Sequence, residues 1–353
     1  MPEHININGE IITPDNLSQW KTDRSGIEAD LAAFLDEWFS DSPGITLQTS
    51  GSTGHPKIIT ADRESMRASA RMTCDFFGLT TASSALLALP LRYIAGKMMV
   101  VRAIVSGCRL IIQEPSSTPL ANIKTKVDFI PMVPMQAITT LQQTNGEQQL
   151  SHARSILLGG GFIDPELSQV LQLIPSQIFA SYGMTETLSH IALRRVNGNE
   201  ADEWYTPLPG IEISLTPAGT LQLSAPKLGI QHLMTNDIAE INAEGRFRIL
   251  GRRDFVINSG GIKIQAEEVE QQLRSACKLN LTIVPAPHPV LGQCVALVWE
   301  GPTCAEAQLR QAIATLPERQ RPRLIRHLKQ LPLTATGKPD RRTAIDIIST
   351  TEL

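Results

Sequence analysis

Cysteine is scarce in this sequence, and no two cysteines stand in a Cys-x-x-Cys pair. The five cysteines are Cys74, Cys108, Cys277, Cys294 and Cys304, an odd number spread over 353 residues. This spacing excludes a disulfide framework and a cysteine-rich zinc site as the basis of the fold. We therefore expect the cysteines to be buried apolar residues or incidental thiols in a reducing compartment.

An excess of charge of either sign is also missing. The chain has 32 Lys and Arg residues against 35 Asp and Glu residues, which gives a formal net charge of −3. The sequence has no stripe of basic residues interleaved with aromatic ones, which would be the electrostatic footprint of a nucleic-acid-binding surface. We expect no nucleic-acid partner.

Long apolar runs are absent as well. The most apolar segment, Met98–Ile112, is interrupted by Arg102 and Arg109 and is too short to span a bilayer. Residues 1–10 lack the basic-then-apolar pattern of a signal peptide. The sequence therefore predicts a soluble, cytoplasmic protein without a transmembrane segment, and it leaves open whether the protein is a homo-oligomer.

Short apolar runs alternate with amphipathic segments in the part of the chain before residue 211. Apolar residues recur with helical spacing in Ile27–Phe39, and a second helix, Arg63–Phe77, is expected to end at Gly78. Further along, a helix is predicted at Gly96–Val105 and short strands at Ala85–Pro90, Gly107–Gln113, Phe129–Pro134, Ser155–Leu158 and Gln177–Phe179. This alternation predicts an α/β fold, with a large N-terminal α/β domain and a mainly parallel sheet.

The pattern changes at Ile211. Residues 211–250 read as short alternating strands separated by turns, as in a small antiparallel β subdomain. Beyond Asp254, helical and strand-like segments mix again. We place a domain boundary near Asp254, which separates an N-terminal domain, residues 1–253, from a small α+β C-terminal domain, residues 254–353.

Gln48–Lys57 is the segment densest in Gly, Ser and Thr, and it reads Q-T-S-G-S-T-G-H-P-K. Its backbone N–H groups and hydroxyls suit a polyphosphate, with Lys57 completing the ring of donors. It is not a Walker loop, because Lys57 is flanked by Pro56 and Ile58 instead of leading through Ser or Thr into a helix. The alternative interpretation is a surface hairpin turn.

Four motifs stand in an informative order along the chain. They are T-S-G-S-T-G-H-P-K at 49–57, S-Y-G-M-T-E-T at 181–187, T-N-D at 235–237 with G-R-R-D at 251–254, and P-L-T-A-T-G-K at 332–338. Together they resemble the adenylate-forming superfamily of acyl- and aryl-CoA ligases, peptide-synthetase adenylation domains and luciferases. L-P-L-R-Y-I-A-G-K-M-M at 89–99, I-L-L-G-G-G at 156–161 and S-G-G-I-K-I-Q-A-E-E-V-E at 259–270 are similar to o-succinylbenzoate–CoA ligases of menaquinone biosynthesis.

The resemblance implies an enzyme that joins 2-succinylbenzoate to CoA through an acyl-adenylate. Its co-substrates are ATP and CoA, its metal is Mg²⁺, and its products include AMP and pyrophosphate. The first step brings two anions together, so catalysis depends mainly on charge neutralisation and positioning. Residues 1–253 would bind ATP and the acid, and residues 254–353 would form a mobile lid. Another acyl- or aryl-CoA ligase, a module that loads a carrier protein, and a non-catalytic nucleotide- or acyl-binding module remain alternatives.

The resemblance assigns catalytic roles to Lys338, Thr185 and Glu186. Lys338 would bridge the reacting carboxylate and the α-phosphate, and Thr185 would hydrogen-bond the α-phosphate. Glu186 would ligate Mg²⁺, which prefers hard oxygen ligands. The alternatives are a solvated surface lysine and a carboxylate favoured by a helix N-terminus.

The resemblance also implies the residues that bind ATP. Asp237 and Arg252 would hold the ribose, with Asn236 in a left-handed turn where the family has glycine. Tyr182 would lie against adenine, unless it is a half-buried core tyrosine, and Arg252 could instead form a surface salt bridge. The remaining positions are Thr49, Ser50, Gly51, Ser52, Thr53, Gly54 and Lys57 at the phosphates, and Gly159, Gly160 and Gly161 beside adenine.

The resemblance assigns the second half-reaction, in which CoA displaces AMP from the acyl-adenylate, to another part of the C-terminal segment. Asp254 matches the hinge about which the lid turns, and Ser259, Gly260 and Gly261 would line the path of the pantetheine, which can pass close to glycine backbone. Phe255 departs from the family, where many members have an acidic or polar residue.

The acid pocket is expected to include Tyr93, Gly96, Lys97 and His190. Once the succinyl carboxylate is activated, the ring carboxylate stays charged and needs a cation or several donors. Lys97 is our choice over Arg92 and His190. The alternative for Lys97 and Arg92 is an exposed helix charge, and the alternative for His190 is a satisfied core histidine.

We predict that Lys338→Ala abolishes adenylate formation and spares thioester formation from pre-made acyl-adenylate, because the lysine serves only one half-reaction. Single-turnover assays of the two half-reactions measure this. Equal loss of both would contradict the assignment.

Overall fold

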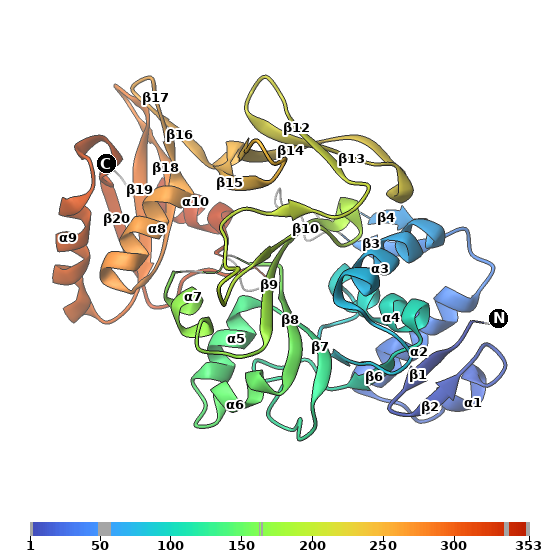
Figure 1. The fold of residues 1–353 in the computed structure, drawn as a ribbon. Helices are drawn as coiled ribbons and strands as arrows, with labels where there is room; N and C mark the ends of the chain where they lie inside the picture. The colour runs from blue at the N-terminus through green and yellow to red at the C-terminus, as the bar shows by residue number, and fades with distance from the viewer. Residues whose placement is uncertain (1–2, 49–57, 162, 164, 335–338, 351–353) are drawn as a thin grey trace. The chain divides into compact units, whose positions relative to one another are not determined.

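The computed structural model describes residues 3–48, 58–161, 163, 165–334 and 339–350 (Figure 1). The chain divides into two compact units. Unit 1 comprises residues 1–163, 167–213 and 223–233, and unit 2 comprises residues 164–166, 214–222 and 234–353. Asp254 lies within unit 2, so the hinge and the domain limits 1–253 and 254–353 remain predictions.

Unit 1 is built on a nine-stranded sheet of order β11-β10-β9-β8-β7-β5-β6-β1-β2. Its strands are β1 (Ile5–Ile7), β2 (Glu10–Ile12), β5 (Ser84–Leu87), β6 (Arg109–Ile112), β7 (Val127–Met132), β8 (Ala153–Leu158), β9 (Gln177–Gly183), β10 (His190–Arg195) and β11 (Thr206–Pro207). The pairs from β1 and β6 through to β8 and β9 are parallel, whereas β2 at one edge and β10 and β11 at the other pair antiparallel. The predicted, mainly parallel sheet is confirmed.

Helices cover both faces of this sheet, because successive residues of its inner strands point to opposite sides. Leu157 of β8 belongs to an apolar core shared with α2, α3 and α4, while its neighbours Ile156 and Leu158 belong to a second core shared with α5, α6 and α7 (Figure 1). The helices are α1 (Leu17–Trp20), α2 (Gly26–Phe39), α3 (Arg63–Phe77), α4 (Ile94–Ser106), α5 (Pro134–Leu141), α6 (Gly146–Ser151) and α7 (Pro165–Leu171).

The ends of α3 and α4 follow from local sequence signals. Asp62 precedes α3, and its side chain accepts a hydrogen bond from the backbone N–H of Ser65 at 2.8 Å, which satisfies one of the free donors of the first turn. Gly78 and Gly107 end α3 and α4 with φ of 61° and 69°, a left-handed conformation that favours glycine. The predicted stop at Gly78 is confirmed.

Two smaller sheets accompany the large one. β3 (Ile45–Gln48) and β4 (Ile58–Ala61) pair antiparallel. β12 (Glu212–Leu215), β13 (Thr220–Ala225), β14 (Ile230–Ile241) and β15 (Phe247–Arg252) form a four-stranded sheet in that order. The predicted strand-rich segment 211–250 therefore forms a sheet, although its residues are divided between the two units.

The rest of unit 2 is a sheet with helices on both faces. Its strands are β16 (Val256–Ser259), β17 (Ile262–Gln265), β18 (Asn280–His288), β19 (Gly292–Glu300) and β20 (Leu324–Leu328). Leu281 and Ile283 of β18 pack with α8 (Ala266–Cys277) and α9 (Glu306–Thr315), whereas Val284 and Ala286 pack with α10 (Arg341–Ser349). This arrangement agrees with the predicted α+β C-terminal segment.

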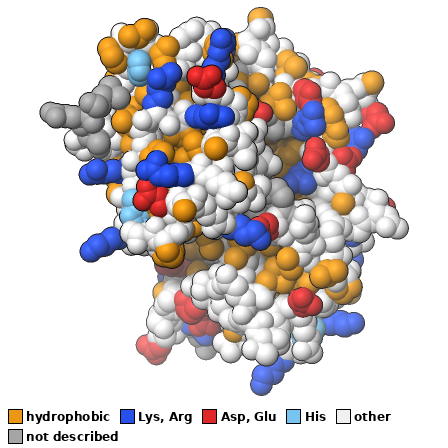
Figure 2. Space-filling model, turned by 90° about the vertical axis from the view of Figure 1, so that its left-hand side faces the viewer, with side chains coloured by type: hydrophobic (Ala, Val, Ile, Leu, Met, Phe, Trp, Pro, Cys, Tyr) orange, Lys and Arg blue, Asp and Glu red, His pale blue; other side chains and the backbone are white. Residues whose placement is uncertain are grey.

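Three compositional expectations can be compared with the described residues. All five cysteines are free, and every one except Cys304 is buried. No helix in the described ranges is both long and apolar enough to cross a membrane. On the face drawn in Figure 2, basic and acidic side chains are interspersed and do not form a continuous basic patch.

Candidate active site

Two predicted segments lie outside the described residues. They contain Thr49, Ser50, Gly51, Ser52, Thr53, Gly54 and Lys57 in one case and Lys338 in the other. The structure describes what flanks them. Gln48 pairs with Ile58 at the end of β3 and the start of β4. Leu333 forms an isolated bridge with Pro339, and the N–H of Asp340 donates to the carbonyl of Pro332 at 2.8 Å. The roles of these residues therefore remain predictions.

The glycine triplet follows β8, and Tyr182 lies near the end of the neighbouring strand β9. Gly159–Gly161 comes directly after β8, and the parallel register pairs Leu158 with Ala180, so the triplet lies beside Ser181. A Cβ atom on Gly159 would approach the Ser181 hydroxyl to 2.7 Å, so there is no room for a side chain. The structure thus brings together the segments predicted to bind adenine, at the carboxyl end of a parallel sheet, where α/β proteins commonly bind ligands.

Thr185 and Glu186 lie on a tight turn after β9, the 3₁₀ helix η1 (Thr185–Thr187). The Thr187 hydroxyl accepts a hydrogen bond from the N–H of Met184 at 2.9 Å and donates one to the carbonyl of Ser189 at 2.7 Å. These two hydrogen bonds stabilise the turn. Glu186 is exposed, and within the described ranges neither its carboxylate nor the hydroxyl of Thr185 has a hydrogen-bond partner. These oxygens suit Mg²⁺ and a phosphate, because Mg²⁺ commonly takes one or two carboxylates together with phosphates and water. Groups of three or more metal-binding side chains do not occur among the residues that the structure describes.

Asp237, Arg252 and Asp254 form an ionic cluster in unit 2. Asp237 on β14 pairs with Arg252 on β15, and an Arg252 Nη1 atom lies 3.3 Å from Asp237 Oδ1. The other side of the guanidinium donates to Asp254 at 3.2 and 2.8 Å. Burial disfavours the charge on Arg252, but the hydrogen bond to Asp254 and the charges of both aspartates outweigh it and raise its pKa. The two predicted ribose ligands and the predicted hinge residue are therefore in direct contact.

One local expectation in this cluster is wrong. Asn236 was expected in a left-handed turn, but it lies inside the extended strand β14 and is not among the described residues with positive φ. Instead, the Thr235 hydroxyl donates to the carbonyl of Leu221 at 2.8 Å and accepts from the N–H of Asp237 at 3.1 Å. Strand pairing and the hydrogen bond from Asp237 to Thr235 hold Asp237 in place, so position 236 does not need a glycine.

Gly260 and Gly261 form the two-residue turn between β16 and β17. Their φ angles are 57° and 82°, which is the requirement of a type I′ hairpin, so the turn alone accounts for both glycines. The N–H of Gly260 donates to the carbonyl of Leu291 at 3.0 Å, which joins the turn to the connection between β18 and β19. A Cβ atom on Gly261 would meet nothing within 4 Å, so this residue faces open space.

Lys97 has an intramolecular role in unit 1. Its ammonium group donates to the carbonyl of Thr46 on β3 at 2.8 Å, lies 3.6 Å from Glu37, and lies over the ring of Phe34. Its charge is therefore already compensated by a carboxylate. Gly96, its neighbour, is close-packed, because a Cβ atom there would approach the carbonyl of Pro90 to 2.5 Å. Arg92 lies over the ring of Tyr93, with its Cζ 4.9 Å from the centroid.

His190 is buried and hydrogen-bonded on both ring nitrogens. Nε2 lies 3.2 Å from the Thr73 hydroxyl and Nδ1 lies 3.3 Å from the Ser189 hydroxyl. Burial, reinforced by the nearby charge of Arg102, lowers the pKa of His190 well below its usual value. The imidazole is therefore neutral at neutral pH and supplies no positive charge, which favours the core-histidine alternative.

Arg102 is the residue that the sequence-based assignment missed. It lies on α4, is 2% exposed, and donates from Nη2 to Ser189, next to His190. Its Nη1 lies 3.5 Å from the Met99 sulfur, its Nε has no partner, and none of the described carboxylates forms an ion pair with it. Burial lowers its pKa to about 10, so it remains charged at neutral pH. The signal was present in the sequence, because Arg102 interrupts the most apolar segment.

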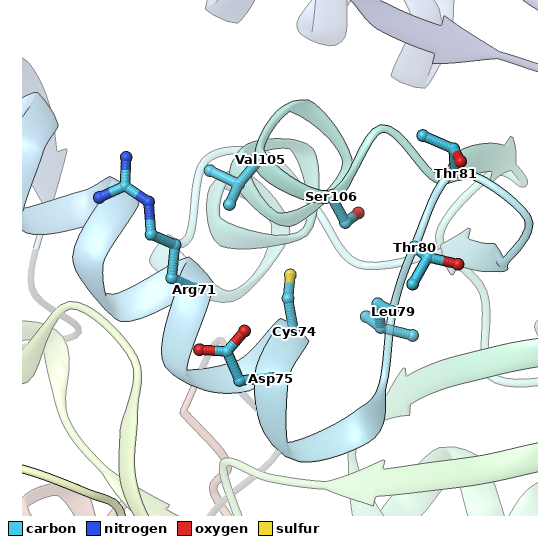
Figure 3. Close-up of a pocket in the computed structure, with 8 residues that line it drawn as sticks. All are labelled: Arg71, Cys74, Asp75, Leu79, Thr80, Thr81, Val105 and Ser106. Atoms are coloured by element: carbon cyan, nitrogen blue, oxygen red, sulfur yellow. The ribbon is translucent and has the colours of Figure 1, made fainter.

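Two surface depressions can be described, one in each unit. One, of about 400 Å³ in unit 1, is bounded by α3, α4 and the segment after α3 (Figure 3). It is lined by Arg71, Cys74, Asp75, Leu79, Thr80, Thr81, Val105 and Ser106. The other, of about 430 Å³ in unit 2, is lined by residues such as Thr216, Asn236 and Arg253. Neither is lined by a predicted site residue.

Comparison with known proteins identifies a matching family and similar sequences. The family described as AMP-binding enzyme matches residues 17–226. A 2-succinylbenzoate–CoA ligase of Listeria monocytogenes is 27% identical over 333 residues, which cover 88% of this chain and 71% of that protein.

Solved structures add two further likenesses. An AMP-forming acyl-CoA synthetase/AMP-acid ligase II-like protein from Dyadobacter fermentans is 33% identical, with a TM-score of 0.63 and coverage of 94% of this chain and 97% of that one. The o-succinylbenzoate CoA synthetase of Bacillus subtilis in complex with the acyl-adenylate intermediate OSB-AMP is 25% identical, with a TM-score of 0.72 and coverage of 86% and 69%.

We predict that Gly261→Leu lowers the yield of CoA ester at least about tenfold while acid-dependent pyrophosphate release stays within about twofold of normal. The leucine would fill the open space expected to line the pantetheine path. Gly245→Leu is the matched control, because Gly245 is also a turn glycine with positive φ, 75°, and open surroundings. A similar fall in both reactions, or the same effect in the control, would contradict the prediction.

Proposed function

This chain belongs to the AMP-binding enzyme family, and from that premise we propose that it ligates 2-succinylbenzoate to CoA through an acyl-adenylate. The family match and the curated relatives support acid–thiol ligation. The observation that carries the choice of an aromatic dicarboxylate is Arg102, a buried cation without a carboxylate partner among the described residues. Its Nη2 atom donates to Ser189, the neighbour of His190, which was predicted to belong to the acid pocket, and this contact supports the proposal.

The proposed reaction has two displacement steps. In the first, a succinyl carboxylate oxygen attacks the α-phosphorus of ATP, and the bond to the bridging oxygen of pyrophosphate breaks. In the second, the CoA thiolate attacks the carbonyl carbon, and AMP leaves with the electron pair of the C–O bond. Lys338 and Thr185 would neutralise and orient the anions of the first step, while Asp237 and Arg252 hold the ribose. Magnesium, when bound at Glu186, would supply further charge neutralisation at the phosphates.

Arg102 would hold the ring carboxylate that survives both steps. A buried charge without a partner is costly, whereas a guanidinium can bind a carboxylate through two parallel hydrogen bonds. The dicarboxylate substrate would therefore supply the counter-ion that the described residues lack. Lys97 supports this role less well, because Glu37 and the carbonyl of Thr46 already hold its ammonium group, and His190 is neutral.

The alternative substrates are acids with one carboxylate. An acyl- or aryl-CoA ligase for such an acid would leave Arg102 without its counter-ion during turnover. We place the reaction in the cytoplasm, where ATP and CoA are available. Homo-oligomer formation remains an open prediction.

Arg102→Met tests the assignment of the acid. We predict that it raises the KM for 2-succinylbenzoate about tenfold or more, corresponding to ~1.4 kcal/mol or above, with little change in the KM for ATP. Pyrophosphate release, measured with and without CoA across a panel of acids, provides the rates. The variant should also lose preference over an analogue that lacks the ring carboxylate.

Two further variants make this test specific. Arg102→Lys keeps the charge but loses the planar fork, so we expect an intermediate KM. Lys97→Met, which follows from the sequence-based assignment, should leave discrimination between the two acids unchanged if Arg102 is the anchor. If Arg102→Met discriminates as well as the parent and Lys97→Met does not, Lys97 is the anchor.

Protein stability gives an independent prediction for Arg102→Met. Removing a buried cation that has no carboxylate partner eliminates a desolvation cost, so the free energy of unfolding without ligand should be unchanged or higher. Thermal unfolding of the ligand-free proteins measures this. A marked loss of stability would show that Arg102 is a structural residue.

A further inference from the structure

Phe255, the residue that departs from the family pattern, is in contact with two arginines in unit 2. The Cζ atom of Arg341 lies 4.4 Å from the centroid of its ring, and the Cζ atom of Arg252 lies 5.5 Å from it. Both distances are within the range of cation–π attraction. The ring therefore links the proposed ribose-binding arginine to the first residue of α10.

Arg341 is itself fixed by a buried ion pair. Its guanidinium binds Glu270 of α8 through two atoms, at 2.7 and 2.8 Å, and also donates to the carbonyl of Ile283 at 2.6 Å. Glu270 is 6% exposed and accepts further hydrogen bonds from the Thr282 hydroxyl and the N–H of Ile283, both at 2.6 Å. Glu270 lies on α8, and Thr282 and Ile283 lie on β18. Because these hydrogen bonds come from regular elements, they fix the position of the Arg341 side chain.

The ion pair holds the chain at the point where the segment carrying Lys338 returns to the described fold. Arg341 lies three positions after Lys338 in the sequence. Between them, Pro339 bridges to Leu333, and the N–H of Asp340 donates to Pro332. The Asp340 side chain caps α10 by accepting from the N–H and hydroxyl of Thr343 at 3.2 and 2.9 Å. The two ends of the segment are thus fastened to each other and, through Arg341, to α8.

Glu267 adds a second connection between the same elements. It is half-buried on α8, and burial together with the nearby charge of Glu270 raises its pKa in spite of the charges of Arg341 and Arg252. A Cβ atom on Gly251 would lie 3.2 Å from its carboxylate. The residues around Phe255 therefore form one charge-compensated group with acidic members from α8 and basic members from β15 and α10.

We propose that Arg341 and Phe255 are positioning residues for adenylation, which fix the base of the segment bearing Lys338 relative to the ribose-binding Arg252. The inference rests on the proposed function and adds that the adenylation geometry depends on Phe255 and on a buried ion pair, neither of which is assigned to substrate binding. A lysine that bridges two anions is sensitive to placement, because misplacement by about 1 Å can cost on the order of a hundredfold in rate.

A purely structural role for the pair makes a different prediction. A structural pair would stabilise unit 2, and its loss would weaken both half-reactions together. A positioning pair acts only where Lys338 acts, so its loss would lower kcat for adenylation and leave thioester formation intact. The KM values for acid and ATP should also stay constant, since neither residue is among those assigned to acid or ATP binding.

The test measures the two half-reactions separately in the full chain. Pyrophosphate release from 2-succinylbenzoate and ATP reports adenylation, and CoA-ester yield from pre-made acyl-adenylate reports the second step. For Arg341→Met we expect adenylation kcat to fall about tenfold or more, with thioester formation within about twofold of the parent. Phe255→Leu keeps the ion pair, and we expect it to lower adenylation kcat about threefold to tenfold. Phe255→Tyr keeps the aromatic ring, so its adenylation kcat should be restored to that of the parent.

Arg321→Met is the matched control for the arginine substitution. Arg321 is also in unit 2 and donates to the carbonyls of Leu316 and Ala314 at 2.9 and 2.8 Å, but it contacts neither Phe255 nor α10. We expect it to leave both half-reactions unchanged. If Arg341→Met fails to fold because the buried Glu270 loses its two-point ion pair, the Phe255 variants still decide the question.

Each failure has a distinct signature. Equal loss of both half-reactions in Phe255→Leu, a rise in the KM for ATP in place of a fall in kcat, or failure of Phe255→Tyr to restore the rate would overturn the positioning role while the parent remains active. Absence of pyrophosphate release by the parent with every acid tested would overturn the proposed function, and this inference with it.

Discussion

The parallel pairing of β8 with β9 determines where most of the candidate site in unit 1 lies. Because Leu158 stands beside Ala180, both strands release their chains at the same edge of the sheet. The glycine triplet follows β8 directly and lies beside Ser181 near the end of β9, and the turn that carries Glu186 comes shortly after β9. Gly183 allows β10 to return at close range, since a Cβ atom there would lie 2.3 Å from the carbonyl of Ser189. Ser189 consequently contacts Arg102 of α4, and His190 contacts Thr73 of α3.

Three arginines illustrate how differently the same side chain can be used within one chain. Arg341 is satisfied by a buried carboxylate, and Arg252 is shared by two aspartates. Arg102 is deeply buried and forms no ion pair with any carboxylate that the structure describes. A buried charge without a counter-ion lowers the stability of a fold. Such a charge is therefore a candidate for binding a ligand.

The sequence allowed the fold to be predicted because it depends on local signals. The spacing of apolar residues and the stop at Gly78 were sufficient for α3, and alternating runs were sufficient for the parallel sheet. The motifs singled out Asp237, Arg252 and Asp254 one by one, and the structure adds that Arg252 contacts both aspartates. Contacts between distant segments were different. The pairing of Lys97 with Glu37, and of Arg102 with Ser189, depends on how α2, α4 and the loop after η1 pack, and no local pattern encodes that packing. The turn expected at Asn236 failed for a related reason, since a long strand in a sheet overrides the local preference of one residue.

The helix α4 contacts two other parts of unit 1 through side chains on different faces. Lys97 and Arg102 lie five positions apart, so at about 100° per residue their side chains leave the helix in directions about 140° apart. Lys97 is directed to β3, the strand that precedes the predicted phosphate segment, whereas Arg102 is directed to Ser189. The two contacts are therefore separable. A substitution at Arg102 leaves the tie between α4 and β3 in place, and a substitution at Lys97 leaves the contact with Ser189 in place.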